Sequence, residues 1–416
     1  MKRAFQIVGF VLCASAAVVP GASADWPQWR GPNRDGVSAE KGLLKAWPAG
    51  GPRLLWKTVG IGSGFGSVSV LGNRLYTTGE GADQSRVLAL NVADGKIVWT
   101  SSPLGKKGGD PVGPQASPAL DGDAVYAMSQ FGDVVCFDAA TGKERWRKSL
   151  VRDFGGSVPG WNYSESPLLD GDRIVCTPGG ARGAIVALNK RTGQVLWQSK
   201  GFKDEAHHSS LISVSIDSVP QYIQLTAQSV AGVDAKTGAL LWRANRPGET
   251  AVVPTPIYAD RCVYVTSGYN AGCNLFEIRQ SGNAFSARQV YAKPQISNHH
   301  GGVIKVGDYI YGHCNSGNWM CQEFRTGRIV WKNRGVGKGS VAYADGHLYC
   351  RSEGSKGTVA LVAATPDGYV EKGRFDQPDR SGENSWAHPV VAGGRLYLRD
   401  QDILLCYDVS DPNAAR

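Results

Sequence analysis

The chain has 416 residues, of which 54 are Gly and 12 are Trp, and only 19% of the residues are charged. Many glycines for turns, many large aromatic side chains for a core and few charges exclude a coiled coil, a disordered chain and a helical bundle, and they favour short strands joined by tight turns. The net charge of +9 is spread along the chain, so nucleic acid is not expected as a partner.

The first residues have the pattern of an export signal. Lys2 and Arg3 precede an apolar run over residues 4–19, and a small-x-small pattern ends at Ala24. A positive start, an apolar run and small residues at its end are typical of a secretory signal peptide. We therefore expect residues 1–24 to be removed by cleavage after Ala24, which predicts a periplasmic or secreted protein.

A lipoprotein acylated at Cys13 is the alternative interpretation of this segment. The large Leu12 directly before that cysteine disfavours it, because lipoprotein processing usually requires a small residue there. No later stretch of the sequence is apolar over the length of a membrane-spanning helix. We therefore expect no transmembrane segment.

The cysteines after residue 24 give no sign of a thiolate metal site, since none are adjacent and none form a Cys-x-x-Cys motif. Cys262 with Cys273, and Cys314 with Cys321, are spaced to face each other across hairpins. The alternative is that the cysteines are reduced and fill small positions in the core.

One sequence motif recurs along the chain. It consists of an apolar strand, a turn with Gly, and a second strand that ends on Trp four residues after the Gly. This pattern is typical of a β-hairpin with a fixed register. A second hairpin precedes each copy, so a unit has four strands, and units recur every roughly 38 to 50 residues, as propeller blades do. The copies end at Trp99, Trp146, Trp197, Trp242 and Trp331, and Tyr291 and Phe375 stand where two further units would carry Trp.

Eight units are found when the divergent segment around Tyr222 is included. The last unit lacks its Trp strand, whereas Trp56 lies on a strand with no hairpin before it. We therefore predict an all-β, eight-bladed propeller of four-stranded antiparallel blades over residues 25–416, with residues 25–50 as an N-terminal extension. The N-terminal strand would complete the C-terminal blade, close the ring and remove two exposed sheet edges.

The phrases FDAATGKERW and VDAKTGALLW resemble the repeat of the pyrroloquinoline quinone (PQQ) β-propellers, and the resemblance covers essentially all of the chain after residue 24. That superfamily includes quinoprotein alcohol dehydrogenases and the non-enzymatic lipoprotein of the outer-membrane protein assembly machinery. The segments that begin at Trp26 and Ser385 also resemble secreted PQQ-like repeat proteins of the planctomycete type. The repeat encodes blade packing, so it indicates the fold and leaves the activity open.

The resemblance implies how a quinone would be held. Quinoprotein alcohol dehydrogenases stack PQQ between a Trp and a disulfide of two adjacent cysteines, above a calcium ion held by acidic and amide side chains. Trp161, Asn162 and Glu165 would be the residues for such roles in this chain. The sequence has no adjacent Cys-Cys pair, which disfavours PQQ as a cofactor.

Histidines gather in one set of predicted loops. The loop that enters the first strand of each blade lies at one mouth of the central channel of a propeller. Of the seven histidines, five fall in these loops: His207, His208, His299, His300 and His388. We therefore predict that this mouth binds a small-molecule or carbohydrate ligand. The alternative is that these histidines only hydrogen-bond backbone groups of a narrow channel.

Imidazole, carboxylate and aromatic side chains at this mouth suit acid–base chemistry, stacking on a sugar or metal binding. Whether the site is catalytic stays open. The catalytic candidates are His208, His300, Glu165 and Tyr163. The ligand-binding candidates are Trp161, Asn162, His207, His299, Lys338, Trp386 and His388. The candidates for holding a divalent metal are His208, His300 and His388.

Three functions are compatible with the sequence. The first is an exported, monomeric propeller that binds a small molecule, carbohydrate or metal at the His-rich mouth, with or without catalysis. The second is a PQQ-dependent oxidoreductase, and the third is a protein-binding scaffold like the assembly lipoprotein.

Overall fold

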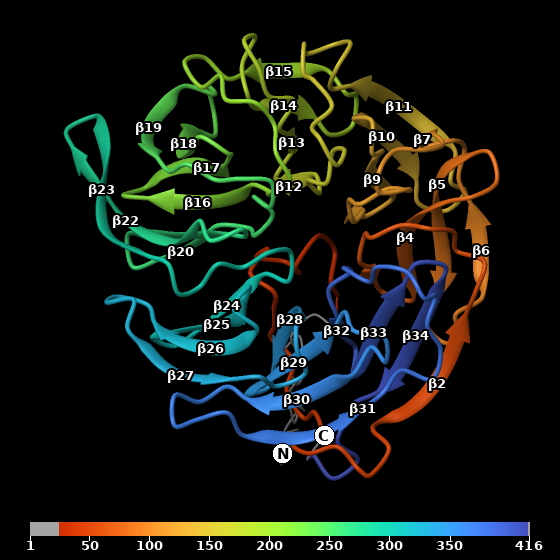
Figure 1. The fold of residues 1–416 in the computed structure, drawn as a ribbon. Coiled ribbons are helices and arrows are strands. Elements are labelled where there is room, and N and C mark those ends of the chain that lie inside the picture. Colours follow the sequence, from red (N-terminus) through yellow and green to blue (C-terminus); the bar gives the residue numbers. More distant parts are fainter. Residues whose placement is uncertain (1–24, 415–416) are drawn as a thin grey trace, which may run out of the picture.

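The computed structural model describes residues 25–414, so the predicted signal peptide lies outside the described residues. Within this range the regular structure consists of 34 strands, and these form eight sheets arranged in a ring (Figure 1). The predicted eight-bladed propeller is confirmed.

Each blade contains a four-stranded antiparallel sheet whose first strand lies towards the centre of the ring, and two blades carry one additional short strand. The first four blades are β3 (Ser69–Leu71), β4 (Arg74–Glu80), β5 (Gln84–Asn91) and β6 (Ile97–Thr100) with the short β7 (Gly105–Lys106); β8 (Ala119–Asp121), β9 (Ala124–Met128), β10 (Asp133–Asp138) and β11 (Glu144–Ser149); β12 (Leu168–Asp170), β13 (Arg173–Cys176), β14 (Val186–Asn189) and β15 (Val195–Gln198); and β16 (Ile212–Ile216), β17 (Val219–Leu225), β18 (Ser229–Asp234) and β19 (Leu240–Asn245).

The remaining blades follow in chain order, and the last two each take a strand from the N-terminal part of the chain. They are β20 (Ile257–Ala259), β21 (Cys262–Ser267), β22 (Gly272–Ser281) and β23 (Ala284–Lys293); β24 (Val303–Val306), β25 (Tyr309–Cys314), β26 (Asn318–Glu323) and β27 (Ile329–Asn333); β28 (Gly339–Ala344), β29 (His347–Ser352), β30 (Val359–Ala363) and β31 (Glu371–Phe375) with β1 (Val37–Ser38); and β32 (Val390–Ala392), β33 (Arg395–Asp400) and β34 (Ile403–Asp408) with β2 (Arg53–Thr58).

The ring is closed as predicted, by an N-terminal strand that completes the C-terminal blade. β2 pairs antiparallel with β34, and Trp56 lies opposite Cys406. The pairing gives backbone partners to two strands that would otherwise be exposed edges.

Most of the repeat tryptophans bond the next blade, whereas the indole N–H of Trp242 donates to Gln221 of its own blade. The indole N–H of Trp99 donates to the carbonyl oxygen of Ala139 at 3.1 Å, and that of Trp146 donates to Lys190 at 2.9 Å. Tyr291 takes the same place in its blade, because its hydroxyl donates to the Phe324 carbonyl oxygen at 2.8 Å. The tryptophans are therefore structural, as the repeat pattern predicted.

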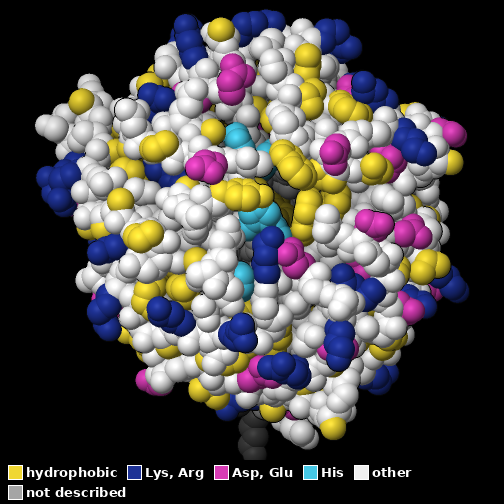
Figure 2. Space-filling model, viewed as in Figure 1, with side chains coloured by type: hydrophobic (Ala, Val, Ile, Leu, Met, Phe, Trp, Pro, Cys, Tyr) yellow, Lys and Arg dark blue, Asp and Glu magenta, His cyan; other side chains and the backbone are white. Residues whose placement is uncertain are grey.

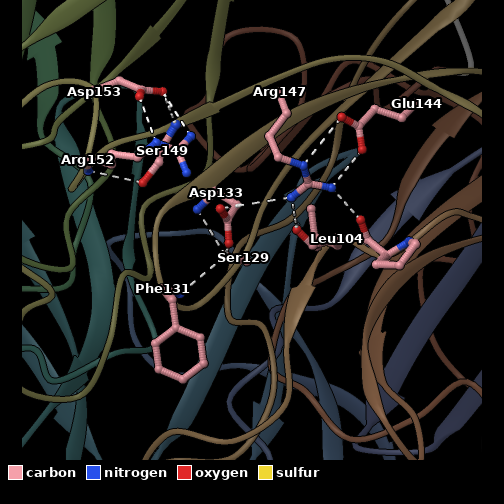
Figure 3. Close-up of polar contacts among 10 residues, drawn as sticks. Leu104, Ser129, Phe131, Asp133, Glu144, Arg147, Ser149, Arg152 and Asp153 are labelled. Atoms are coloured by element: carbon pink, nitrogen blue, oxygen red, sulfur yellow. Dashed lines mark hydrogen bonds and ion pairs between the residues drawn. The ribbon is translucent and has the colours of Figure 1, made fainter.

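Polar contacts add to the packing between blades. Arg147 on β11 donates to the carbonyl oxygens of Leu104, at 2.7 Å, and Pro103, at 2.5 Å, in the loop that follows β6 (Figure 3). Its guanidinium group also lies 2.8 Å from Glu144 Oε2. One arginine on an outer strand thus links the first two blades.

All eight described cysteines are buried and free. In the antiparallel register of β21 and β22, Cys262 lies opposite Glu277 and Cys273 lies opposite Thr266. The alternative of reduced cysteines that fill core positions is therefore correct, and the pairing across this hairpin is not formed.

The N-terminal extension runs through the centre of the ring (Figure 1). We call residues 26–44 the channel plug, because they contact the inner part of every blade. Backbone bonds join Trp26 to Val70 and Pro27 to Leu120, which belong to the first two blades. Arg34 donates to the carbonyl oxygens of Ser166, Pro167 and Leu211 at 2.9, 3.0 and 2.7 Å, in the third and fourth blades.

The rest of the channel plug contacts the last four blades. The indole N–H of Trp29 donates to Thr255 Oγ1 at 3.0 Å, and Arg30 donates to the Val303 carbonyl oxygen at 2.6 Å. β1 pairs in parallel with β28. Glu40 accepts hydrogen bonds from the backbone N–H groups of Gly393 and Gly394. The sequence marked this segment only as an extension, and its position in the channel is a finding of the structure.

We expect Gly142→Ala to unfold more easily than Gly122→Ala. Both glycines have positive φ, +69° and +57°, but a Cβ at Gly142 would lie 2.6 Å from the Trp99 ring, whereas a Cβ at Gly122 meets no atom within 4 Å. The steric clash should bring the loss for Gly142→Ala to about 2 to 3 kcal/mol, against about 1 kcal/mol for the backbone strain alone. Urea unfolding followed by tryptophan fluorescence measures both, and equal losses would contradict the role of the Trp99 contact.

Candidate functional site

A cavity of about 260 Å³ lies at the mouth that the sequence singled out. Figure 2 shows it as a hollow near the centre of the ring, where histidines lie beside hydrophobic side chains. The lining includes five large aromatic side chains, Trp29, Phe65, Trp161, Tyr269 and Trp386, and four histidines, His208, His299, His300 and His388. Among the described residues, no Asp, Glu, Lys or Arg belongs to this lining. The site is therefore aromatic and uncharged.

The structure brings six of the predicted site residues together. They come from the loops that precede β12, β16, β24 and β32, so the repeat geometry does place these loops at one mouth. The six are Trp161, His208, His299, His300, Trp386 and His388.

The other predicted residues are not part of the lining. The catalytic candidates Glu165 and Tyr163 are fully buried. Glu165 accepts hydrogen bonds from the backbone N–H and hydroxyl of Thr177, at 2.7 and 3.0 Å, and burial raises its pKa to about 7. The Tyr163 hydroxyl donates to the Pro178 carbonyl oxygen at 2.9 Å. Both side chains thus hold the loop before β12 in place.

Three ligand-binding candidates also lie behind the cavity wall or beside it. Asn162 is buried and donates to the Pro111 carbonyl oxygen at 3.0 Å. His207 packs edge-on against the ring of His208, with centroids 4.5 Å apart. Lys338 lies 3.0 Å from Glu353 Oε1. These residues act on the site through their neighbours.

The hydrogen bonds around His208 fix its tautomer. Gln115 Nε2 donates to the Trp161 carbonyl oxygen at 2.8 Å, so Gln115 Oε1 is free to accept the Ser164 hydroxyl proton at 2.5 Å. His208 Nδ1 lies 3.1 Å from Ser164 Oγ. Because that hydroxyl already donates, Nδ1 must carry the proton, and Nε2 keeps a lone pair.

His300 and His299 form a chain that begins at Glu353. Glu353 Oε2 lies 3.0 Å from His300 Nε2, and His300 Nδ1 lies 2.9 Å from His299 Nδ1. Burial raises the pKa of Glu353, but His300 and Lys338 outweigh it and hold the value at about 2. Glu353 Oε2 and His300 Nε2 are close but not aligned as a hydrogen bond. A lone pair on Nε2 would be repelled by the carboxylate at this distance, so the proton of the neutral His300 lies on Nε2. His299 then donates from Nδ1 and keeps a lone pair on Nε2.

The tautomer of His388 is opposite to that of His208 and His299. Its Nε2 lies 2.9 Å from the carbonyl oxygen of His300, which only accepts, so Nε2 carries the proton and Nδ1 the lone pair. Burial lowers the pKa of His388 and of His208 to about 3, and that of His299 to about 4. All three rings are therefore neutral near pH 7 and offer hydrogen-bond acceptors.

These tautomers bear on the metal hypothesis. The Nδ1 lone pair of His300 accepts from His299, and the Nε2 of His388 is protonated. In the part of the chain from residue 25 to 414, no three His, Cys, Asp or Glu side chains are grouped as a metal ion would require. In the described structure, His208, His300 and His388 are therefore not arranged as a metal site.

Ring contacts hold the aromatic walls in position. Phe65 stacks on Trp386 with centroids 4.6 Å apart and planes at 25°, and Trp386 contacts His300 at 5.4 Å. Trp29 of the channel plug contacts His388 at 4.6 Å. Packed rings lose little conformational freedom when a ligand binds, so the walls are largely preformed.

Sequence reasoning missed Trp29, Phe65 and Tyr269 of the lining, and also Glu353 beside His300. Glu353 follows β29, and the second strand of a blade ends beside the start of the first, so polar residues after second strands were a usable signal. Trp29 had no such signal, because the repeat pattern says nothing about a segment outside the blades.

Comparison with known proteins gives the family. The family model described as outer membrane protein assembly factor BamB matches residues 36–129 and 83–333. The chain belongs to this family of PQQ-repeat propellers. Its members share the blade repeat, so membership explains the ring and the tryptophans that join its blades.

Individual members of the family and its relatives are distant. The polyvinylalcohol dehydrogenase of Sphingopyxis sp. strain 113P3 is 23% identical over 404 residues, which cover 77% of this chain and 60% of that protein. The BamB of Shewanella oneidensis is 24% identical over 58% of this chain and 61% of its own length. The matched part of this chain thus covers 60% of the length of the first relative and 61% of the length of the second.

The fold similarity is broader than the sequence similarity. The crystal structure of BamB from Moraxella catarrhalis aligns with a TM-score of 0.61 and 16% identity, and the alignment covers 84% of this chain and 95% of that chain.

Among residues 25–414, no helix has the length and apolar character needed to cross a membrane.

The cavity lining does not fit PQQ. That quinone carries three carboxylate groups, which need cationic or strong donor partners when they are buried. The described lining has no Lys or Arg, its His208, His299 and His388 present lone pairs, and the sequence has no adjacent cysteine pair. The side chains of this cavity therefore do not suit PQQ as a ligand.

We expect the free energy of unfolding to fall as the pH drops from 6.5 towards 4. Burial lowers the folded-state pKa of His208, His299 and His388 below the unfolded value. Between these values the unfolded chain therefore binds more protons than the folded chain does. Each histidine contributes at most about 1.4 kcal/mol per pH unit. Urea titrations at pH 7, 5.5 and 4.5 measure the slope. His388→Gln should make the slope shallower, and an unchanged slope would contradict the assignment for His388.

Proposed function

We propose that the cavity binds an uncharged, hydroxyl-rich small molecule of the carbohydrate class. The observation that carries the proposal is the composition of the lining, which combines five large aromatic side chains with neutral imidazoles and, among the described residues, contains no ionisable carboxylate, lysine or arginine. A charged ligand would lose its hydration there without gaining an opposite charge.

The aromatic walls suit a sugar ring. The C–H faces of a pyranose are apolar and flat, and they pack well on the face of an indole or phenol ring. Trp29, Trp161, Tyr269 and Trp386 reach the lining from four separate segments. A ring bound among them is held on more than one face.

The imidazoles suit the hydroxyl groups of a sugar. His208 and His299 present Nε2 lone pairs, and His388 presents an Nδ1 lone pair, so each accepts a hydrogen bond from a ligand hydroxyl. The carboxylate of Glu353, acting through His300, makes His299 the most basic of these acceptors. A ligand without O–H or N–H donors would leave them unpaired.

The name of one relative is consistent with a ligand that is rich in hydroxyl groups. This relative is named polyvinylalcohol dehydrogenase, and polyvinyl alcohol is a carbon chain that bears hydroxyl groups. We also propose that residues 1–24 direct export to the periplasm or beyond, on the pattern of charged, apolar and small residues at the N-terminus, and that the mature protein acts there as a monomer.

We expect monosaccharides and disaccharides to bind the purified protein and to quench its tryptophan fluorescence. The panel is glucose, galactose, mannose, xylose, N-acetylglucosamine and their common disaccharides, measured by isothermal titration calorimetry. Trp386→Ala should weaken binding by about tenfold or more through lost stacking. Val195→Ala, on an outer strand of the ring, is the control. A panel without any binding would contradict the proposal.

We expect the acceptor at His299 to matter for affinity. His299→Leu removes the lone pair, so the ligand hydroxyl stays unpaired and affinity should fall about tenfold. His299→Gln keeps an acceptor oxygen and should lose less. Equal losses for the two variants in the same calorimetric titration would show that His299 acts only by its shape.

A further inference from the structure

The channel plug closes the inner end of the cavity. Trp29 belongs both to the plug and to the cavity lining, and its indole N–H is held by Thr255 at 3.0 Å. Arg30 and Arg34 of the plug are also buried, with only 3% and 2% of each residue exposed. The side chains of the plug thus stand where an open propeller would have a channel.

The space behind Trp29 is too small for a ligand to pass. A second cavity, between Trp29, Arg30 and His388, has a volume of about 10 Å³, which is room for one water molecule at most. Arg30 fills the remaining space with hydrogen bonds to the carbonyl oxygens of Val303 and Asp35, at 2.6 and 2.7 Å. The main cavity therefore opens to solvent at one face.

Two aromatic side chains extend from the lining into solvent at that opening. Trp161 is 49% exposed and Tyr269 is 47% exposed, although both line the cavity. The backbone carbonyl oxygen of Trp161 accepts a hydrogen bond from Gln115, and the Tyr269 ring packs edge-on against His299 at 5.1 Å. Large exposed aromatic side chains at the rim of a pocket mark a surface that a ligand covers.

We propose that this site takes the free end of a carbohydrate chain and excludes internal segments. The terminal ring lies in the cavity, and the next ring lies against Trp161 and Tyr269 at the rim. An internal segment has chain on both sides and needs an open groove or two exits, which the plug removes. The cavity of about 260 Å³ is slightly below the roughly 300 Å³ at which pockets for drug-sized ligands begin, so it holds about one ring.

This inference rests on the proposed carbohydrate binding, and its first test is the effect of chain length. Affinity should rise about tenfold from monosaccharide to disaccharide, as one further stacking contact would give, and should then level off. Trp161→Ala should abolish this rise, so that this variant binds the disaccharide no more tightly than it binds the monosaccharide. Val158→Ala, an exposed residue of the same loop that is outside the lining, is the matched control. A rise that survives in Trp161→Ala would overturn the role of the rim.

The second test asks whether a free end is required. A trisaccharide of the sugar that binds best is blocked with a benzyl group at either of its two ends. One blocked form should lose at least a hundredfold in affinity, while the other should bind like the free trisaccharide. Equal binding by both blocked forms, or loss by both, would overturn end recognition while leaving carbohydrate binding intact. If no sugar of the monosaccharide and disaccharide panel binds, the proposed function itself falls, and this inference falls with it.

Discussion

The rest of the structure depends on the hydrogen bonds that the buried guanidinium group of Arg34 makes in the middle of the ring. A ring of eight blades brings eight inner strands together around a channel, and their backbone groups need partners. Arg34 donates to the carbonyl oxygens of Ser166, Pro167 and Leu211, and so joins two blades through one side chain.

A buried cation is costly unless it is well bonded. Burial lowers the pKa of Arg34 to about 10, and the nearby charge of Glu165 opposes this shift, so the side chain stays protonated near neutral pH. Glu165 is in turn held by Thr177. This explains why a carboxyl group that the sequence offered for catalysis lies outside the cavity: it is part of the polar support around the plug.

Filling the channel also creates the site. With the plug in place, Trp29 becomes part of the lining, and the loops before the inner strands surround a pocket that is closed at its inner end. Burial in that pocket keeps the histidines neutral, and their contacts with Ser164, Glu353 and the His300 carbonyl oxygen decide which nitrogen of each ring accepts. The character of the site therefore follows from the closure of the channel.

The sequence by itself determined the ring, its eight blades, its closure by the strand of Trp56, and the gathering of histidines at one mouth. It did so because hairpin turns, strand alternation and the Gly-to-Trp spacing are local patterns, repeated often enough to be read without a structure. Only the tertiary structure decided the role of Trp29, which bonds a residue 226 positions away, and of Arg30, which bonds one 273 positions away. It also separated Glu165 from the cavity and brought Glu353 to His300. Contacts of this kind depend on how the blades meet in space, and the repeat does not encode them.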